Sequence, residues 1–288
     1  MDWIIYLFGS GAMFFIGVAL ALVGAAIDAP AWRHRLAMLL AFVGLLLIGL
    51  SATPLPYWLY AVAGIATLVW MNTGWIKSLR SKQAWIRALV AAGWLACLAW
   101  EVPHHLMPAL DASRNRSIHV IADSVTAGMS DSDKETWPLL LARDHPDLEI
   151  VSHAKMGATC ASALRQAERI PDDAGLVLLE IGGNDLLGTT SSTKFERDLD
   201  ALLTRVCRPD RVVAMLELPL PPLTNEFGRI QRLLAAKHRV PMMPKRPFAE
   251  VLTTPGATVD GIHLTRLGHR LMADVVWRFI GIAVEAKR

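Results

Sequence analysis

Charged residues are nearly absent from the first third of this chain, and that absence limits how the first third can fold. Residues 1–100 contain only eight Asp, Glu, Lys or Arg, although 19% of the 288 residues in the whole chain are charged. A helical bundle in water needs a polar face on each of its helices. The same stretch holds eight of the ten tryptophans, and the mean hydropathy of the chain, +0.36, is high for a soluble domain. We therefore expect this region to lie in a membrane.

Four apolar stretches come close to the roughly 20 residues that a helix needs to cross a bilayer. They cover residues 3–27, 36–52, 55–76 and 84–100, and Thr53-Pro54-Leu55-Pro56 predicts a tight turn between the second and the third. A cleaved signal peptide is the alternative for the first stretch. It requires a basic start and a shorter apolar core, whereas this chain begins Met1-Asp2. The sequence therefore predicts a transmembrane region of four helices within residues 1–105.

Basic residues indicate the side of the membrane on which each loop lies, because positively charged loops stay in the cytoplasm. They follow the first stretch and separate the third from the fourth: Arg33, His34, Arg35, Lys77, Arg80, Lys82 and Arg87. This pattern places the amino terminus outside, and four crossings bring everything after residue 101 outside as well. We expect an integral membrane protein, in a bacterial inner membrane, with its polar part facing the periplasm or the exterior.

Tryptophans and small residues agree with this interpretation. Tryptophans gather near the ends of the stretches, as in the aromatic belts of membrane proteins: Trp3, Trp32, Trp58, Trp75, Trp85 and Trp100. Small residues in the first stretch allow helices to pack closely: Gly17, Ala21, Gly24 and Ala25. After the last stretch, Glu101, His104 and His105 are either metal ligands or part of a hydrated linker, and the linker is the favoured interpretation.

The remaining two thirds of the chain alternate short apolar runs with amphipathic ones. The apolar runs predict strands at residues 118–122, 148–152, 176–181, 212–218 and 240–243. Helices are predicted at 135–143, 161–169, 193–206, 224–238 and 265–286. Apolar strands separated by helices are typical of a parallel sheet covered on both faces. We expect one α/β domain over residues 117–288, and the absence of a basic tract with aromatics argues against a nucleic-acid partner.

Polar features follow the predicted strands, and in open parallel sheets sites lie beyond the carboxyl ends of the strands. Ser124 follows the first strand, Gly157 the second and Asn184 the third, while Asp260 and His263 precede the last helix. Each of these alone is explained as well by a turn or a helix cap. Their combination at one edge of one sheet predicts a site.

The residue types at this edge fit nucleophilic catalysis. A serine hydroxyl becomes a nucleophile when a base takes its proton, and His263, oriented by Asp260, is a candidate base. The oxyanion that forms needs hydrogen-bond donors. The backbone N–H groups of Ser124 and Gly157 and the side-chain amide of Asn184 are the candidates.

Other histidines and cysteines receive simpler interpretations. His119 is expected in the core and His145 and His269 at the surface, while His153, near Gly157, is a possible substrate contact. Cys160 and Cys207 are both expected outside the cytoplasm, where a disulfide is allowed. The sequence does not decide whether they pair.

The order Asp-Ser, then Gly157, then Gly-x-Asn-Asp, then Asp-x-x-His resembles the four blocks of the SGNH (GDSL-type) serine hydrolases, above all the thioesterase/lysophospholipase/arylesterase branch. The matching stretches are ADSVTAG, TWPLLLA (136–142), LLEIGGNDLLG (178–188) and DGIHLTRLGH (260–269). The resemblance covers about residues 117–279 and implies a flavodoxin-like fold with about five parallel strands. Ala122 replaces the glycine that usually precedes Asp-Ser, and the membrane region has no counterpart in the secreted members.

The resemblance also implies roles for individual residues. Ser124 would be the nucleophile and an oxyanion donor, Gly157 and Asn184 would complete the oxyanion hole, and Asp260 with His263 would form the base pair. No metal or organic cofactor is implied. Together with the apolar region, this predicts a membrane-anchored esterase acting on lipid, lysolipid or thioester substrates, with membrane lipids around it. The alternatives are an O-deacetylase or acyltransferase acting on envelope glycans, and a catalytically inactive binding module.

Overall fold

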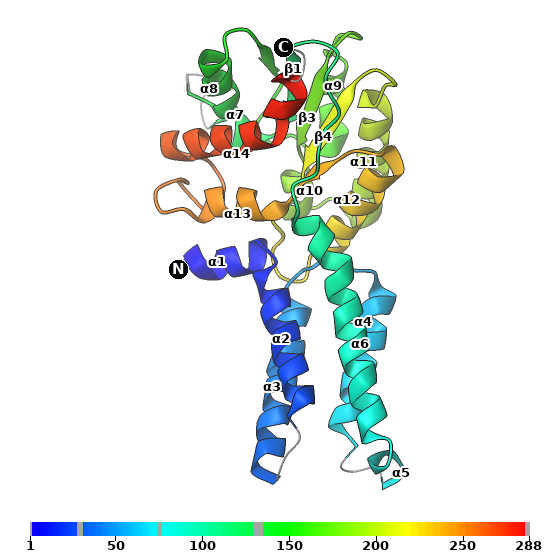
Figure 1. Cartoon of the computed structure of the whole chain (residues 1–288). Helices are drawn as coiled ribbons and strands as arrows, with labels where there is room; N and C mark the ends of the chain where they lie inside the picture. Colours follow the sequence, from blue (N-terminus) through cyan, green and yellow to red (C-terminus); the bar gives the residue numbers. More distant parts are fainter. Residues whose placement is uncertain (1, 28–30, 74–76, 129–134, 286–288) are drawn as a thin grey trace. The chain divides into compact units, whose positions relative to one another are not determined.

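The chain divides into two compact units in a computed structural model, which describes residues 2–27, 31–73, 77–128 and 135–285. The helical unit comprises Leu7–Leu106 and Leu220–Asn225. The α/β unit comprises Met1–Tyr6, Met107–Pro219 and Glu226–Arg288. Figure 1 shows the elements of both.

The amino-terminal third is helical, as its composition predicts. Its elements are α1 (Asp2–Gly9), α2 (Ala12–Ala26), α3 (Ala31–Leu50), α4 (Tyr57–Met71), α5 (Lys77–Arg80), α6 (Gln83–Glu101) and the 3₁₀ turn η1 (Val102–His105). Residues 74–76 of the third expected stretch, including Trp75, lie outside the described residues. The first expected stretch is not one straight helix, because α1 and α2 meet at a bend of 79°. Gly11 has a left-handed backbone, φ 79°, which ends the first helix before Ala12 begins the second.

The expectation of four membrane-spanning helices is met only in part. Residues Gln83–His105 form one helix that is long and apolar enough to cross a membrane. The bent pair of α1 and α2 is a second candidate if both helices belong to one broken span. The apolar helices His34–Leu50 and Tyr57–Met71 are shorter.

Small residues bring α2 and α3 into close contact, as the sequence predicts. Gly17, Ala21, Gly24 and Ala25 are all buried. A Cβ atom on Gly17 would lie 2.7 Å from the carbonyl oxygen of Gly44, so the two backbones touch there. In the second helix pair, the indole Nε1 of Trp94 in α6 donates a hydrogen bond of 2.9 Å to the hydroxyl of Thr67 in α4.

The α/β unit is built on a sheet of five strands in the order β2-β1-β3-β4-β5. They are β1 (Ser117–Ala122), β2 (Glu149–Ser152), β3 (Leu176–Glu180), β4 (Val212–Leu216) and β5 (Met242–Met243), and every pairing is parallel. This confirms the predicted parallel sheet. The last strand is shorter than predicted because Pro241 has no N–H group to donate to the sheet.

Helices cover both faces of the sheet (Figure 1). On one face α8 (Trp137–Asp144), α13 (Lys245–Thr253) and α14 (Arg266–Glu285) share a core with the alternate strand residues Ile118, Val120, Leu176 and Leu178. On the other, α9 (Cys160–Ala167), α11 (Ser192–Val206) and α12 (Asn225–His238) pack on Ile121, Val177 and Leu179. Successive strand residues thus face opposite layers. The helix α13 was not predicted from the sequence.

Candidate active site

Ser124 begins a one-turn helix, α7 (Ser124–Ala127), directly after β1. Asp123 caps this helix: its Oδ1 accepts a hydrogen bond of 3.0 Å from the N–H of Val125, and its carbonyl accepts one of 2.9 Å from Ala127. Gly128, with φ 79°, ends the turn. The cap explains why a strand here runs into an acid and a hydroxyl, since the acid holds the turn that carries the hydroxyl.

The structure brings Ser124, His263 and Asp260 together in a hydrogen-bonded chain. Ser124 Oγ lies 3.1 Å from Nε2 of His263, and Nδ1 of that ring lies 2.6 Å from Oδ2 of Asp260. Such a chain allows the imidazole to take the serine proton while the carboxylate holds the ring in place. Residues 124 and 263 are separated by 139 positions, so the fold, not local sequence, creates this arrangement.

A tight turn sets the geometry of the acid and the base. The other carboxylate oxygen of Asp260, Oδ1, accepts hydrogen bonds from the backbone N–H groups of Ile262 (3.0 Å) and His263 (2.9 Å). The hydrogen bond from the N–H of His263, followed by the one from its ring, lowers the pKa of Asp260 to about 2. Asp260 is therefore ionised at neutral pH and able to stabilise a positively charged imidazole.

Asn184 lies one strand away, on α10 (Gly183–Leu187), which starts immediately after β3. Gly182 has φ 113°, a conformation that L-residues rarely adopt, and it turns the chain from strand to helix. The side-chain Nδ2 of Asn184 donates to the carbonyl of Ala158 at 3.0 Å and to Oδ2 of Asp123 at 3.3 Å. An amide NH₂ carries two hydrogens, so an oxyanion would have to replace one of these acceptors, and the longer bond to Asp123 is the easier to exchange.

Gly157 lies in the loop between β2 and α9, with φ 68°. A Cβ atom at this position would meet nothing within 4 Å. The glycine is therefore explained by its backbone conformation, and the space beside it is open to a ligand. The next helix is held in place by the buried Asp185, whose Oδ2 accepts a hydrogen bond of 2.8 Å from the N–H of Cys160.

Asp123, Asp185 and Glu180 are buried acids around this edge of the sheet whose importance the sequence did not reveal. Burial raises the pKa of Asp123 to about 6, against its hydrogen bond from Val125. The one signal in the sequence is a charged residue that ends an otherwise apolar strand, as Glu180 does in LVLLE. Buried charges that are tolerated at a sheet edge are often part of a functional site.

The remaining histidines differ in part from expectation. His119 is buried, as predicted, and its Nδ1 lies 3.1 Å from Nε2 of His153, with burial lowering the pKa of both rings. His269 was expected at the surface but is buried within α14, and its Nδ1 accepts a hydrogen bond of 3.3 Å from the N–H of Trp137. His145 was also expected at the surface, but it is half-buried and stacks on the ring of Trp277 at 3.6 Å between ring centres.

The structure also describes the residues considered as metal ligands and the cysteines. Glu101 pairs with His105 through an Oε1–Nε2 distance of 3.1 Å. Within the described ranges, no group of three His, Cys, Asp or Glu side chains is arranged to hold a metal ion. Cys97, Cys160 and Cys207 are free thiols, so the disulfide between the latter two is not formed.

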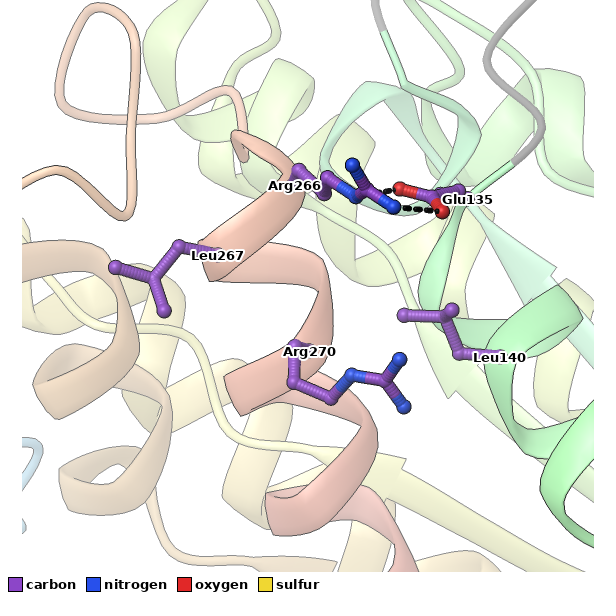
Figure 2. A pocket seen from close by; sticks show the side chains of 5 residues that line it. All are labelled: Glu135, Leu140, Arg266, Leu267 and Arg270. Atoms are coloured by element: carbon purple, nitrogen blue, oxygen red, sulfur yellow. Dashed lines mark hydrogen bonds and ion pairs between the residues drawn. The ribbon is translucent and has the colours of Figure 1, made fainter.

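A pocket of about 430 Å³ opens between α8 and α14 (Figure 2). Its walls are Glu135, Leu140, Arg266, Leu267 and Arg270. Both guanidinium groups are paired with acids, Arg266 with Glu135 and Arg270 with Asp144 at 2.9 Å. Each lining arginine thus has an acidic partner, and Asp144 is shared with Arg143 at 3.3 Å.

The chain is similar to known esterases. The model of the GDSL-like Lipase/Acylhydrolase family matches residues 123–271. Esterase TesA of Pseudomonas aeruginosa is 24% identical over 205 residues, which cover 67% of this chain and 96% of that protein. Thioesterase 1/protease 1/lysophospholipase L1 of Escherichia coli K12 is 25% identical over 185 residues, covering 61% of this chain and 89% of that protein.

Solved structures show the same fold. The psychrotrophic esterase EstA from Pseudoalteromonas sp. matches with a TM-score of 0.53 and 19% identity, covering 59% of this chain and 100% of that chain. The crystal structure of TesA matches with a TM-score of 0.52 and 23% identity, covering 57% and 97%.

A parallel sheet that presents a serine, an imidazole and a carboxamide at one edge, together with a family match over about half of the chain, defines the class of protein. This chain belongs to the GDSL-like Lipase/Acylhydrolase family and is a GDSL/SGNH-type esterase. The matched region begins after the amino-terminal helices.

Proposed function

We propose that this protein is a membrane-anchored serine esterase with a Ser124–His263–Asp260 triad. The observation that carries the proposal is the chain of contacts from Ser124 Oγ to His263 at 3.1 Å and from His263 to Asp260 at 2.6 Å. These distances lie within hydrogen-bond reach, which a nucleophile and its base require.

The reaction has two halves. Ser124 Oγ forms a bond to the acyl carbon while His263 Nε2 takes the hydroxyl proton. The C–O or C–S bond to the leaving group then breaks, and His263 returns that proton to the departing alcohol or thiol. Water next attacks the acyl-enzyme, His263 takes a proton from it, and the carboxylic acid leaves as Ser124 Oγ regains its hydrogen.

The negative oxygen of each tetrahedral intermediate needs donors that are in place beforehand. We assign this role to the backbone N–H groups of Ser124 and Gly157 and to the Nδ2 of Asn184. The contact of 3.0 Å from Nδ2 to the carbonyl of Ala158 holds the amide in place, and the oxyanion takes the position of Asp123 Oδ2, which lies 3.3 Å from Nδ2. All the groups that this mechanism uses come from the protein chain.

Acyl esters of lipids or lysolipids, or thioesters, are the proposed substrates. The names of the relatives, an esterase and a thioesterase/lysophospholipase, support this class. Exposed apolar side chains flank the proposed catalytic residues: Met156 precedes Gly157, and Ile262 precedes His263. Long acyl chains gain free energy by covering such surface, at about 25 cal/mol for each Å² removed from water.

The helical unit supports the membrane part of the proposal. Only 28% of the apolar window in helix Gln83–His105 is buried, whereas the core helix of a soluble protein is mostly buried. Large apolar side chains are exposed along α3 and α4, among them Phe42, Leu46, Val62 and Ile65. Trp58, Trp85 and Trp100 are exposed near helix ends. Lipid is the medium in which such a surface is stable.

A fluorophosphonate probe tests the catalytic proposal. The detergent-purified full chain should be labelled at one serine, and Ser124→Ala should lose both labelling and ester hydrolysis. Thr126→Ser, which keeps a hydroxyl two residues away, is the matched control and should be labelled. Labelling that survives in Ser124→Ala contradicts the assignment of the nucleophile.

A panel of esters with rising acyl length tests the substrate class. Rates should increase from acetyl towards longer chains. A preference for acetyl esters would favour the O-deacetylase alternative, and product formation only with an added acceptor alcohol would favour acyl transfer. A reporter fused after Arg288 tests the topology: we expect activity outside the cytoplasm only, and cytoplasmic activity contradicts the proposed orientation.

A further inference from the structure

Glu180 is the last residue of β3, and only 1% of its surface is exposed. The four residues before it in the strand are apolar and completely buried. Moving a carboxyl group out of water is costly unless the group is hydrogen-bonded. A carboxyl group at this position, beside the turn that carries Ser124, therefore needs an explanation.

Glu180 contacts the turn on both sides of Ser124. Its backbone carbonyl accepts a hydrogen bond of 3.2 Å from the N–H of Asp123, the residue before the serine. Its side-chain Oε2 accepts one of 2.9 Å from the hydroxyl of Thr126, two residues after the serine. Thr126 is itself held from the other side, because the indole Nε1 of Trp137 donates to its Oγ1 at 2.9 Å.

This network is shut off from solvent, since neither Thr126 nor Trp137 has any exposed surface. Its members come from α7, β3 and α8, so it ties the short helix α7 to the next helix, 11 positions on, and to a strand 54 positions on. A helix of four residues is too short to be stable by itself. The direction in which Ser124 Oγ and its N–H point thus depends on contacts of this kind.

Burial shifts the pKa values of the two neighbouring acids, Asp123 and Glu180. Burial first, and then the nearby charge of Asp123, hold the pKa of Glu180 well above its usual range. The pKa of Asp123 is about 6. Burial therefore favours the protonated form of Glu180, and in either form its Oε2 can accept the hydrogen bond from Thr126. A glutamine has nearly the same shape and the same carbonyl acceptor.

We propose that Glu180 is a positioning residue for the nucleophile: through Thr126 its side chain fixes the turn that aims Ser124 at the acyl carbon. It does not touch the substrate. The inference rests on the proposed function of Ser124 and adds to it the support behind the nucleophile. Displacements of about 1 Å in a reacting group can cost on the order of 100-fold in rate.

Four single variants of the detergent-solubilised full chain test this role. Glu180→Gln should keep kcat within about threefold of the unmodified enzyme, because it preserves the acceptor. Glu180→Leu and Thr126→Val remove the contact from either side, and each should lower kcat about 10- to 100-fold with KM changed less than about twofold. Thr126→Ser, which keeps the hydroxyl, should remain close to the unmodified enzyme.

Rates are expressed per active site titrated with a fluorophosphonate. A loss of folded protein lowers the number of titrated sites, whereas misaligned serines lower the rate at each of them. The double variant Glu180→Leu/Thr126→Val completes a double-mutant cycle. It should lose about as much activity as Thr126→Val alone, because Thr126→Val already removes the contact with Glu180 together with the one from Trp137.

Several outcomes overturn the proposal while leaving Ser124 as nucleophile. They are an unchanged kcat in Thr126→Val, a loss in Glu180→Gln equal to that in Glu180→Leu, and losses that multiply in the double variant. If Glu180→Leu does not fold, Thr126→Val and Glu180→Gln still decide the question. Failure of the esterase assignment is recognised separately, by Ser124→Ala that keeps its activity.

Discussion

The two units of this protein differ in how their helices meet and in what they leave exposed. In the helical unit α2 and α3 touch backbone to backbone at Gly17 and Gly44, and large apolar side chains such as Phe42 are exposed although Trp70 and Trp94 are buried inside. In the α/β unit the helices pack on a sheet through large side chains such as Phe195 and Trp137, which are completely buried. Close backbone contact with apolar side chains outside fits the proposed lipid environment, where no hydrophobic force drives helices together.

Buried polar groups show the same contrast. In the helical unit, Thr67 and Trp94 satisfy each other in a local pair. In the α/β unit, Asp123, Glu180 and Asp185 gather at one edge of the sheet, within reach of the candidate nucleophile and oxyanion donor. Each buried acid costs stability unless its partners compensate. Charged burial is not confined to that edge, because Glu101 is buried in the helical unit and Glu217 pairs with the buried Arg232 at 2.7 Å. Asp123 and Glu180 differ in that their contacts reach Asn184 and the turn that carries Ser124.

Among the following variants, Asn184→Ala should give the largest loss of kcat, because it removes a polar group from the candidate site of the α/β unit. Removing one oxyanion donor typically lowers kcat by about 10² to 10³, and we expect that range here, with KM little changed. The measurement is kcat per fluorophosphonate-titrated site on a short-chain ester.

Asn72→Ala is the matched control in the helical unit, because Asn72 also donates a side-chain hydrogen bond to a carbonyl, that of Leu68, at 2.8 Å. It should leave kcat unchanged. An Asn184→Ala enzyme with full activity would remove Asn184 from the oxyanion hole.

The sequence predicted the strands of the sheet more accurately than the helices. The apolar runs located all five strands, because the central strands are buried on both faces and are mostly apolar, whereas the edge strand β2 (EIVS) is only partly buried. The helix α13 was missed, since its sequence KRPFAEVLT is short and contains a proline. In the helical unit, composition identified the helices but not the break before Ala12, which depends on the backbone of a single glycine.

The candidate site was predicted from motifs, and the structure adds what supports it. The sequence order of Ser124, Asn184 and His263 along the sheet edge was enough to suggest that they meet. The roles of Glu180 and the burial of His269 depend on contacts between elements far apart in the chain, with Thr126 and Trp137 respectively. No local pattern contains that information.

Asp123→Asn should change how the stability of the α/β unit depends on pH. Burial raises the pKa of Asp123 from 3.8 to about 6, so between these values the folded state binds more protons than the unfolded state. The contribution of Asp123 is therefore most favourable below pH 3.8 and falls as pH rises to about 6. Over this window the contribution of Asp123 to the free energy of unfolding falls by about 3 kcal/mol. The Tm of the variant, relative to the unmodified protein, should rise across this window.

Asp260→Asn is a control in which the stabilising contribution of the carboxylate depends on pH with the opposite sign. The pKa of Asp260 is lowered to about 2, so its stabilising contribution is complete above its unfolded value of 3.8 and is lost as pH falls towards 2. The Tm deficit of this variant relative to the unmodified protein should therefore shrink as pH falls from about 4 towards 2. A Tm difference for Asp123→Asn that is flat from pH 4 to pH 6.5 would contradict the burial of an ionisable Asp123.

Gly44→Leu should have the smallest effect on catalysis and tests whether the two units differ as described. A Cβ atom on Gly44 would lie 2.6 Å from the carbonyl oxygen of Gly17, so leucine must push α2 and α3 apart. Gly49→Leu is the matched control on the same helix, because a Cβ there meets nothing within 4 Å. We expect Gly44→Leu to lower the thermal stability of the helical unit in detergent, with Gly49→Leu unchanged, and both to keep kcat per titrated site within about twofold. A large fall in kcat for Gly44→Leu alone would mean that helix packing in the helical unit acts on the catalytic edge, and the two units would then have to be treated as one functional body.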